Sequence, residues 1–495
     1  MPTTIVWFRR DLRVHDLPAL ATAAAEGRVV PLFVFDDRLL DPRRRWGSGP
    51  RTGWMLGCLA DLDEQLRRRG GRLFVRHGRP ETVLAGLARE VGATDVRFTA
   101  DVSPFARRRD GRVRAALEAQ GVRVHAMAGA GVVDDPAQIV TQKGTPFTVF
   151  APYKRAWLKA ERRRFDPAPN TLHVPPDLDP GALPTLADLG LSDDGVDLGP
   201  DSAFPPGEGA GRKRLDDFLS SGALDGYRET RNDPAGGGSR LSPYLRWGCV
   251  SPLELDARVV AYGSDGANRY RDEIAWRDFY AAVLVHFPDV TEHAWQERYR
   301  ALQWDRDDAL LQAWKDGRTG YPLVDAGMRQ LRAEGWMPNR VRMTVGSFLT
   351  KDLHQDWQAG EAWFMRWLLD GDVAANNGNW QWVASVGTDP APYFQRLFNP
   401  VLQQEKFDPD GVYVRRWVPE LAHVETQHLA MPWEMTEIDQ GLAGCVIGTD
   451  YPAPIVDHKA ERERAIERYR AAAATAGSGS NSGSGAGART GAAAT

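Results

Sequence analysis

The sequence predicts an α/β domain with a five-stranded, doubly wound parallel sheet, followed by a larger all-α domain. Two observations carry this prediction. In residues 1–130, short β-branched runs alternate with helical segments, an order typical of βαβ units around a parallel sheet. In residues 206–470, apolar residues recur three and four positions apart without a series of strands, which indicates helices.

The expected strands of the first domain are apolar runs bounded by turn residues. They lie at 4–8, 29–36, 72–77, 95–100 and 122–128, with helical patterns at 17–27, 80–92 and 105–120. Ligands of such a sheet bind at the carboxyl ends of the strands, near the point where the strand order reverses. The loop after the first strand, FRRDLRVHD, lacks the glycines that let a backbone approach a pyrophosphate, so an ordinary dinucleotide site is not expected there.

Two segments flank the expected helical domain. Residues 131–205 are rich in Pro, Gly, Asp and Leu and show little periodicity. We expect them to form an ordered interdomain connector, because a connection this long is usually functional or a linker and residues 145–160 are too apolar for a free chain. Residues 471–495 are Gly, Ser and Ala rich, and we expect a disordered low-complexity tail.

The composition excludes several classes of protein. With 495 residues, 42% hydrophobic and 26% charged, the chain is expected to be a soluble globular protein of two to four domains. It has no run of eighteen apolar residues and no apolar core of a secretory signal, so no membrane partner is expected. Its three distant cysteines favour a reducing cytoplasm. The net charge of −4 means that a polyanion would need a local basic patch.

Tryptophan is the most informative residue type. Twelve of the 17 tryptophans lie between Trp276 and Trp433. Such clustering points to stacking or electron transfer, and aromatic packing between helices is the alternative.

Two segments of the helical half could bind polar ligands. In residues 236–248, three glycines precede SRLS, whose amides and hydroxyls suit a phosphate, although a glycine-rich turn with a serine cap is the alternative. In residues 270–280, Glu273, Trp276 and Arg277 share a helix face. The alternative there is a surface Glu–Arg pair beside a core tryptophan.

Two later segments combine charged, amide and indole side chains. Asn339, Arg342 and Met343 share a helical face or its margin, and they suit a ring edge, an anion and an apolar group respectively. Asp370 and Asp372 precede two asparagines and two tryptophans. No third ligand is spaced to complete a cation site with these aspartates, so no metal is expected.

Eight segments resemble those of the photolyase/cryptochrome family, in the family's order. They cover nearly the whole chain up to about residue 470, and the chain is most similar to class I cyclobutane pyrimidine dimer photolyases. The segments are WFRRDLRVHD, SRLSPYLRWG, EIAWRDFY, GRTGYPLVDAGMRQL, WMPNRVRM, SFLTKDLHQDW, DGDVAANNGNWQW and PYFQRLFNP.

The resemblance implies a U-shaped FAD in the helical domain. Arg342 and Asp370 would pair beneath the isoalloxazine, Asp372 would contact its pyrimidine edge, and Asn376 would face N5. Three tryptophans match the family's electron-transfer chain, and the alternative for each is that its indole only packs in the core. The electron-transfer chain would consist of Trp380, Trp357 and Trp304. The remaining FAD-binding positions are Tyr227, Ser239, Arg240, Leu241, Ser242, Arg277 and Asn339.

The resemblance also implies a damaged-DNA substrate, single- or double-stranded, whose pyrimidine dimer is flipped out of the helix. Light would excite reduced FAD, one electron would split the dimer and then return, and Glu273 would stabilise the dimer radical anion. The expected lesion contacts are stacking by Trp276 and Trp382, packing by Met343, hydrogen bonds from Glu273 and Asn339, and phosphate or lesion contacts by Arg231 and Arg340.

A light-harvesting antenna is implied as well. Arg51 and Asp101 match positions that contact such a chromophore, and an 8-hydroxy-deazaflavin is favoured over methenyltetrahydrofolate or an empty site. Gly238, Pro338 and Asn379 stand where the family has threonine, histidine and glycine.

Three other functions compete with repair by a monomeric enzyme. A cryptochrome-like photoreceptor is disfavoured by the complete lesion set and the short tail. A six-four photolyase is disfavoured because residues 335–343 contain no histidine. A Rossmann-type enzyme is disfavoured by the missing glycines.

Overall fold

The N-terminal sheet has five parallel strands, as the sequence predicts, and their order is β3-β2-β1-β4-β5. In register, Ile5 of β1 lies between Val30 of β2 and Val96 of β4. The strand order reverses between β1 and β4, which makes their carboxyl ends the expected place for a ligand. The strands are β1 (Thr3–Phe8), β2 (Arg28–Phe35), β3 (Phe74–His77), β4 (Asp95–Thr99) and β5 (Arg123–Met127).

Both faces of the sheet are covered, because alternate strand residues point to opposite sides. Ile5 and Trp7 pack in a cluster with residues of α4 (Pro80–Val91) and α5 (Pro104–Glu118), whereas Val6 and Phe8 pack with α1 (Pro18–Glu26) and α3 (Gly49–Arg67). Helix α2 (Asp37–Leu40) follows β2. The sheet is therefore doubly wound, in agreement with the sequence.

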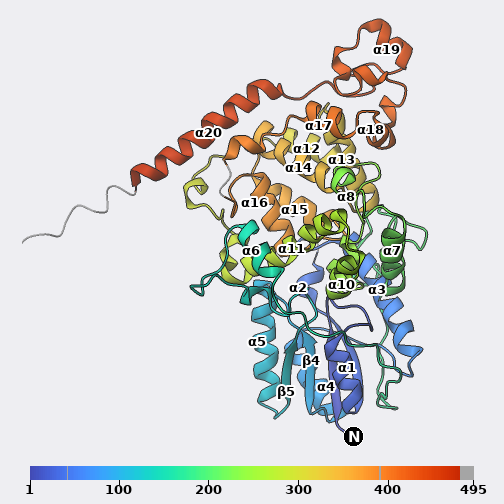
Figure 1. Ribbon diagram of the computed structural model, residues 1–495. Coiled ribbons are helices and arrows are strands. Elements are labelled where there is room, and N and C mark those ends of the chain that lie inside the picture. The colour runs from blue at the N-terminus through green and yellow to red at the C-terminus, as the bar shows by residue number, and fades with distance from the viewer. Residues whose placement is uncertain (42, 390–391, 480–495) are drawn as a thin grey trace, which may run out of the picture.

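The computed structural model describes residues 1–41, 43–389 and 392–479. Figure 1 shows the sheet domain at the N-terminal end and the larger helical domain beside it. The connector between them contains η1 (Pro136–Gln138) and α6 (Phe150–Trp157) and contacts both domains. Leu172 donates from its amide to the carbonyl of Arg69 at 2.7 Å, and the indole of Trp157 donates to Asp278 at 2.9 Å.

The described part of the chain after residue 206 is helical, with only isolated bridges in place of strands. None of the described helices is long and apolar enough to cross a membrane. The helices are α7 (Glu208–Ser220), α8 (Tyr227–Thr230), α9 (Ser242–Trp247), α10 (Pro252–Tyr262), α11 (Asp265–His286), α12 (Asp308–Asp316), α13 (Pro322–Glu334), α14 (Asn339–Ser347), α15 (Trp357–Trp367), α16 (Val373–Val383), α17 (Pro400–Phe407), α18 (Val412–Trp417), α19 (Glu437–Ala443) and α20 (His458–Gly479).

The predicted start of the disordered tail, at residue 471, is too early in the sequence. Helix α20 continues to Gly479, so residues 471–479 are helical, and residues 480–495 lie outside the described chain. The segment is alanine rich, which favours a helix over a coil. Its docking also explains the difference, since Tyr469 and Ala472 are buried against the helical domain.

Helix α16 and the three helices that it contacts form the centre of the helical domain. Helix α16 packs against α11, α14 and α15. Its contact with α11 requires Gly378, because a Cβ there would overlap the ring of Tyr280. A five-residue π-helix (Phe348–Asp352) follows α14 and turns the chain toward α15.

Candidate flavin site and nucleic-acid interface

Arg342 and Asp370 form the ion pair that the sequence predicts. The two guanidinium Nη atoms of Arg342 donate to the Asp370 carboxylate at 3.2 and 2.8 Å. Ser242 donates to the same carboxylate at 2.6 Å and accepts from the indole of Trp336 at 3.1 Å. These contacts tie the start of α9 and helix α14 to the loop before α16.

The glycine-rich segment before α9 is a tight loop. Gly238 has φ +88°, a conformation in which the family's threonine would be strained, and Arg240 is also left-handed at φ +55°. The Ser239 hydroxyl lies 2.8 Å from the hydroxyl of Tyr270. Tyr270 packs edge to face with the buried Tyr227. The loop therefore presents its polar groups beside an aromatic wall.

Arg240 and Leu241 differ in what they offer a ligand. The guanidinium of Arg240 pairs with Glu334 at 2.8 Å and lies 4.7 Å over the ring of Trp336. Burial lowers the pKa of Arg240, and Glu334 opposes that shift. Leu241 is buried, and only its amide contacts the Ser239 hydroxyl, at 3.3 Å.

Asp372 and Asp101 are joined by Arg10. The guanidinium of Arg10 lies 3.0 Å from Asp372 and 3.7 Å from Asp101. Burial raises the pKa of both carboxyls, but the charge of Arg10, with help from other arginines, outweighs it and leaves both pKa values below the ordinary range. Both groups are held as carboxylates at the carboxyl ends of β1 and β4.

The two residues expected to contact an antenna, Arg51 and Asp101, lie at the domain interface. Arg51 of α3 is buried and donates to the carbonyls of Met365 and Trp46. Burial lowers the pKa of Arg51 to about 10. Asp101 accepts from the amide of Ser103 at 2.9 Å in addition to its pairing with Arg10. Both side chains are thus engaged by the protein itself.

Arg277 and Asn376 are held by backbone carbonyls. Arg277 donates to the carbonyl of Ala130 at 2.6 Å and to that of Leu245 at 3.3 Å. The amide nitrogen of Asn376 donates to the carbonyl of Glu361 at 3.0 Å. This bond directs the other end of the amide, its oxygen, away from α15.

Glu273 lies in a group of arginines rather than beside Arg277. Its carboxylate contacts Arg231 at 3.1 Å and Arg269 at 3.0 Å. The surrounding protein raises the pKa of Glu273, and the two arginines oppose that shift. The carboxylate thus pairs with Arg269, one turn earlier on α11, and with Arg231 from a separate segment, and not with Arg277 as in the alternative of a surface pair.

The remaining lesion residues lie on α14 and α16. The guanidinium of Arg340 donates to Asn232 at 2.9 Å and stacks on Phe407, and the amide of Asn339 lies 3.7 Å from the sulfur of Met343. Arg340 and Arg231 repel each other, which contributes to the lowered pKa of Arg340 after burial.

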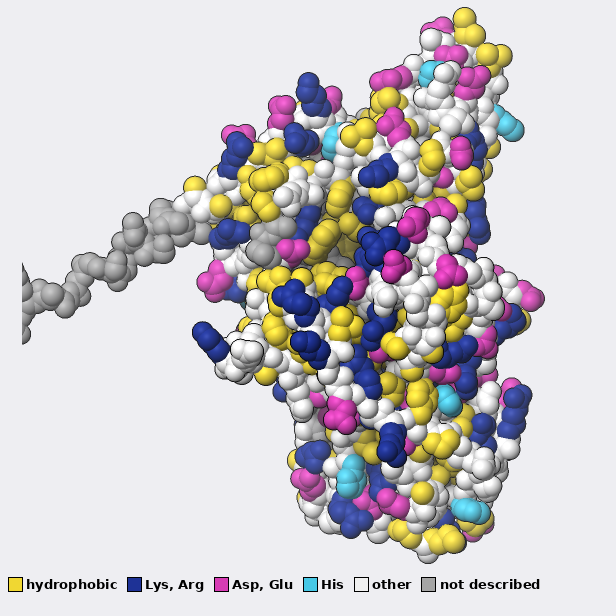
Figure 2. Space-filling model, in the orientation of Figure 1, with side chains coloured by type: hydrophobic (Ala, Val, Ile, Leu, Met, Phe, Trp, Pro, Cys, Tyr) yellow, Lys and Arg dark blue, Asp and Glu magenta, His cyan; other side chains and the backbone are white. Residues whose placement is uncertain are grey.

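Trp276 and Trp382 are both partly exposed and each stacks on a neighbour. The ring of Trp276 lies parallel to that of Phe150, with centroids 3.7 Å apart. The guanidinium of Arg396 lies 4.2 Å over the ring of Trp382. Figure 2 shows a hollow in the helical half with hydrophobic side chains in it and Lys and Arg side chains around it.

The three tryptophans of the expected chain run from buried to partly exposed. Trp380 and Trp357 are 3% exposed, whereas Trp304 is partly exposed. The amide of Asp305 donates to the carbonyl of His354 at 2.8 Å, so the loop with Trp304 runs beside the residues that lead into α15. Trp314, which the sequence analysis did not single out, lies 6.3 Å from Trp380 between ring centroids.

Asn379 points outward. Its side chain is exposed and donates to the carbonyl of Ala375 at 2.8 Å, so it does not separate Trp380 from the neighbouring helices. Pro338 is the buried N-cap residue of α14.

Arg10 and Arg246 are functional candidates that the sequence reasoning missed. Arg246 donates to the carbonyl of Gly371 at 2.7 Å, while its Nη1 is buried without a hydrogen-bond partner in the described chain. Burial and the nearby Arg10 lower the pKa of Arg246. The available signal was the position of Arg10 directly after the first strand.

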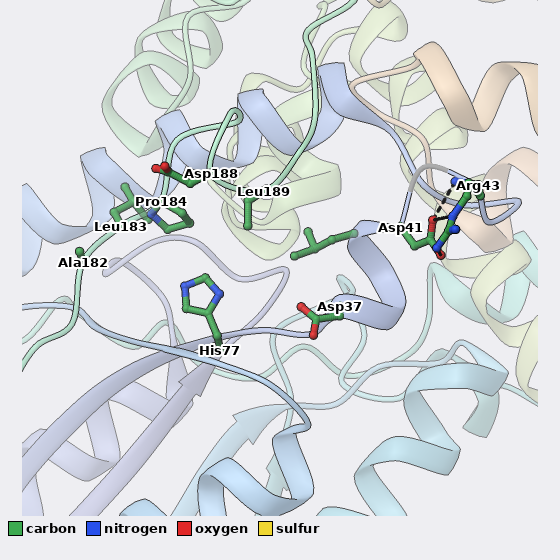
Figure 3. Close-up of a pocket in the computed structure, with 10 residues that line it drawn as sticks. Asp37, Asp41, Arg43, His77, Ala182, Leu183, Pro184, Asp188 and Leu189 are labelled. Carbon is green, nitrogen blue, oxygen red and sulfur yellow. Dashed lines mark hydrogen bonds and ion pairs between the residues drawn. The ribbon is translucent and has the colours of Figure 1, made fainter.

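A separate hollow of about 750 Å³ lies at the edge of the sheet domain. Figure 3 shows His77 at the end of β3 and Asp37 of α2 facing this space, opposite the connector residues. It contains none of the residues predicted for the flavin, lesion or antenna sites.

The residues present fit a bound FAD in the helical domain. The buried Nη1 of Arg246 can donate to an anionic or carbonyl oxygen, and the buried indole nitrogen of Trp380 also lacks a partner among the described residues. A Cβ at Gly238 would meet open space, which leaves room beside the SRLS backbone.

Comparison with known proteins gives the family. The family model of DNA photolyase matches residues 4–173, and the FAD binding domain of DNA photolyase matches residues 270–471. A deoxyribodipyrimidine photo-lyase of Streptomyces griseus is 42% identical, over 95% of this chain and 99% of that protein. A class III photolyase of Agrobacterium tumefaciens has a TM-score of 0.87 at 38% identity, covering 95% of this chain and 98% of that one. A Synechocystis cryptochrome has the same TM-score at 30% identity, covering 94% and 99% of the two chains. The chain therefore belongs to the DNA photolyase family of enzymes and carries its FAD-binding domain.

Proposed function

We propose that this protein repairs cyclobutane pyrimidine dimers in damaged DNA, as a cytoplasmic monomer that uses reduced FAD and light. The observation that carries the proposal is the arrangement of α11, α14 and α16. Each helix contributes to both expected sets: Arg277 and Glu273 on α11, Arg342 and Met343 on α14, Asn376 and Trp382 on α16. Because α16 packs against the other two helices, the flavin and lesion sets belong to one framework.

The chain's own residues would hold and orient FAD. When bound, photoexcited reduced FAD supplies the electron that splits the dimer and receives it again. The Arg342–Asp370 pair would set the local charge beneath the ring system, and Asp372, kept ionised by Arg10, would accept hydrogen bonds from its pyrimidine edge. The Asn376 oxygen would accept from N5–H, since its amide nitrogen is occupied by Glu361.

The phosphates and the remaining FAD groups would be held by the loop before α9. Ser239, Arg240 and the amides around Leu241 would serve the phosphates, with Tyr227 packed beside them. Arg277 and Asn339 would complete the contacts. Ser242 supports this site through its bond to Asp370.

The lesion would enter between Trp276 and Trp382, with Met343 against its apolar edge. Glu273 and Asn339 would hydrogen-bond the base edges, and a neutral Glu273 could donate to a pyrimidine carbonyl as charge develops there. Arg231 and Arg340 would contact the adjoining phosphates and give DNA binding a salt dependence.

The tryptophans would serve reduction rather than repair. Trp380, Trp357 and Trp304 would carry an electron from the surface to the flavin site. Support comes from their graded exposure and from the pairing of the Trp304 loop with the chain before α15.

An antenna would bind at the carboxyl ends of β1 and β4, near Arg51 and Asp101. An archaeal photolyase from Sulfolobus tokodaii has been solved with two FAD molecules and a proposed light-harvesting role for one of them. We favour an 8-hydroxy-deazaflavin over methenyltetrahydrofolate for this chain. Its binding would have to add to the existing contacts of Arg51 and Asp101.

Illumination of the reduced holoprotein with DNA that contains defined lesions tests the proposal. We expect restored thymines from cyclobutane dimers, none from six-four photoproducts, and none in the dark. A protein that binds reduced FAD but leaves the dimers intact would instead be a photoreceptor, the function suggested by the similarity to a cryptochrome.

A further inference from the structure

Trp276 is covered on one face by the connector. The ring of Phe150, at the start of α6, lies parallel to the indole within 7°, with centroids 3.7 Å apart. Phe279 and Tyr280 flank the same indole at 5.5 and 5.3 Å. A parallel contact at this distance fixes the plane of the indole, which otherwise turns about two side-chain torsions.

Trp382 is covered on one face by a buried cation. The guanidinium of Arg396 stands 4.2 Å over the indole and donates to the backbone carbonyl of Trp382 at 3.0 Å. Asp389 joins the two side chains, because its carboxylate lies 2.6 Å from Arg396 and accepts from the Trp382 indole at 3.1 Å. The ring is thus held by its face, its edge nitrogen and its backbone.

The backbone of Arg396 is itself anchored. Its carbonyl accepts hydrogen bonds from the buried ammonium of Lys351 at 2.5 Å and from the hydroxyl of Ser347 at 3.1 Å. The Arg396 residue is 2% exposed. A guanidinium so enclosed, with Asp389 and a carbonyl as partners, is placed to support an indole rather than to reach a DNA phosphate.

We propose that Phe150 and Arg396 are positioning residues for the lesion, which hold Trp276 and Trp382 from behind. The inference rests on the proposed function, since it assumes that the two tryptophans stack on the flipped dimer. Each indole then offers its uncovered face to the substrate. Neither positioning residue touches the DNA.

Pre-ordering of the two indoles strengthens lesion binding. A free side chain loses conformational entropy when it is immobilised on binding, at a cost to affinity. Phe150 and Arg396 remove most of that cost before the lesion arrives. The two residues stack on the tryptophans through different groups, so we expect them to respond differently to substitution. Phe150 stacks through a flat aromatic ring, and Arg396 stacks through a flat cation.

The test measures the affinity of the holoprotein for dimer-containing and for undamaged DNA over a series of salt concentrations. Phe150→Leu removes the flat ring, and Phe150→Tyr restores it. Arg396→Lys keeps the charge but loses the planar stack. Phe165→Leu and Arg332→Lys are matched controls, because Phe165 is an exposed ring elsewhere and Arg332 stacks on Trp367, apart from Trp276 and Trp382.

We expect Phe150→Leu and Arg396→Lys to weaken dimer binding by about three- to tenfold. Affinity for undamaged DNA, the salt dependence and the controls should not change, and Phe150→Tyr should bind like the unaltered protein. Equal losses of affinity for damaged and undamaged DNA would show that the substitutions act on DNA binding in general, and would overturn the proposal. Unchanged dimer affinity in both variants would overturn it as well.

Trp276→Ala and Trp382→Ala distinguish a failure of the proposed lesion site from a failure of the positioning role alone. If these variants bind the dimer normally, the stacking assigned to the tryptophans is wrong and the proposed lesion site fails. If they lose dimer affinity while Phe150→Leu and Arg396→Lys do not, only the positioning role fails. Thermal melting of every variant identifies any that misfold, and Arg396→Lys, which keeps the charge, still tests the positioning role if Phe150→Leu does not fold.

Discussion

Individual side chains in the helical domain are set by neighbours that lie far away in the chain. At Glu273 the distant neighbour is Arg231, whereas Arg269 lies one turn earlier on α11. The carboxyl has a raised pKa in spite of both arginines, because the surrounding protein limits its hydration. The neutral form of Glu273 therefore persists to a higher pH than usual. A neutral carboxyl is a hydrogen-bond donor, which suits a pyrimidine carbonyl.

The first prediction concerns the pH dependence of repair. Because the pKa of Glu273 is raised above its ordinary 4.5, donation to the lesion should weaken as the pH rises through that pKa. Glu273→Gln donates at every pH, so its repair yield should lose this pH dependence. The comparison is the repair yield of chemically reduced protein against pH. A pH profile that is the same in Glu273→Gln and the unaltered protein would remove this role from Glu273.

The second prediction concerns Asp370. Asp370→Asn leaves Arg342 without its carboxylate, and we expect the free energy of unfolding to fall by about 1.5–3 kcal/mol and FAD retention to fall with it. Urea denaturation and the flavin absorbance after gel filtration measure the two effects. Asp216→Asn, which breaks an exposed pair with Arg258, is the control and should change stability by less than about 0.5 kcal/mol. Full FAD retention in Asp370→Asn would contradict the assignment.

At the scale of elements, the packing of α16 decides where the candidate residues lie. Gly378 lets α16 approach Tyr280 of α11, and the same helix carries Asn376, Trp380 and Trp382. Successive residues of a helix turn by about 100°, so Trp380 and Trp382 face different neighbours although they are two positions apart. One helix can therefore carry both Trp380, for electron transfer, and Trp382, for stacking on the lesion.

The third prediction separates these two roles. Trp380→Phe should slow light-driven reduction of oxidised flavin at least tenfold, because phenylalanine is a much poorer electron donor, while chemically reduced protein should repair dimers normally. Flavin absorbance under illumination gives the first rate, and a repair assay gives the second. Trp417→Phe, a partly buried indole in the same cluster, is the control. An equal loss of both activities would refute the role of Trp380 in reduction.

The fourth prediction concerns Gly378. Gly378→Ala places a methyl group where the ring of Tyr280 lies, and we expect α16 and α11 to separate slightly, at a cost of about 1–3 kcal/mol in the free energy of unfolding. Gly86→Ala in α4 is the control, since a Cβ there meets nothing within 4 Å. Equal stability of the two variants would show that α11 and α16 accommodate the methyl group at little cost in free energy of unfolding.

The elements that sequence reasoning placed correctly are those with a clear period. All five strands were predicted because each is a short apolar run between turns. Helix α3 was missed because Gly53 and Gly57 weaken its pattern. Those glycines are needed where Leu198 of the connector and Pro206, just after it, approach the helix. The end of α20 was missed because its docking depends on distant partners, as the burial of Ala472 against the helical domain shows.

Contacts between distant segments also limit how much of the candidate site the sequence predicts. The Arg342–Asp370 pair was predicted from resemblance, and the structure confirms that the two side chains pair. Of the partners of Glu273, Arg269 lies one turn earlier on α11, a spacing that predicts contact, whereas Arg231 comes from another segment and could not be predicted from spacing. Phe150 and Arg396 could not be found at all from the sequence, since their importance appears only when the connector and the segment after α16 fold onto the two tryptophans.

At the scale of the whole molecule, the two domains are joined through buried charge. Arg10, at the end of β1, pairs with Asp101 of the sheet domain and Asp372 of the helical domain. Arg51 of α3 adds bonds to backbone carbonyls of the helical domain. Relative motion of the domains is therefore costly, which suits a fixed distance between an antenna and a flavin.

The fifth prediction follows from the lowered pKa of Asp101. A carboxyl whose pKa is lowered on folding stabilises the fold above its ordinary pKa, and this stabilisation is lost as the pH falls through the lowered value. Asp101→Asn should reduce the free energy of unfolding at neutral pH by about 1–3 kcal/mol and flatten its decline below about pH 4. Urea denaturation at several pH values measures this, with Glu118→Gln as an exposed control. An unchanged slope in Asp101→Asn would exclude the Arg10 pairing as a source of stability.

For repair to proceed as proposed, the flavin and the flipped dimer must lie within electron-transfer distance in the helical domain. The most direct measurement is the fluorescence lifetime of reduced FAD in the holoprotein, with and without dimer-containing DNA. We predict a clearly shorter lifetime when the dimer is bound and no change with undamaged DNA of the same sequence. An unchanged lifetime with dimer-containing DNA fully bound would contradict the claim.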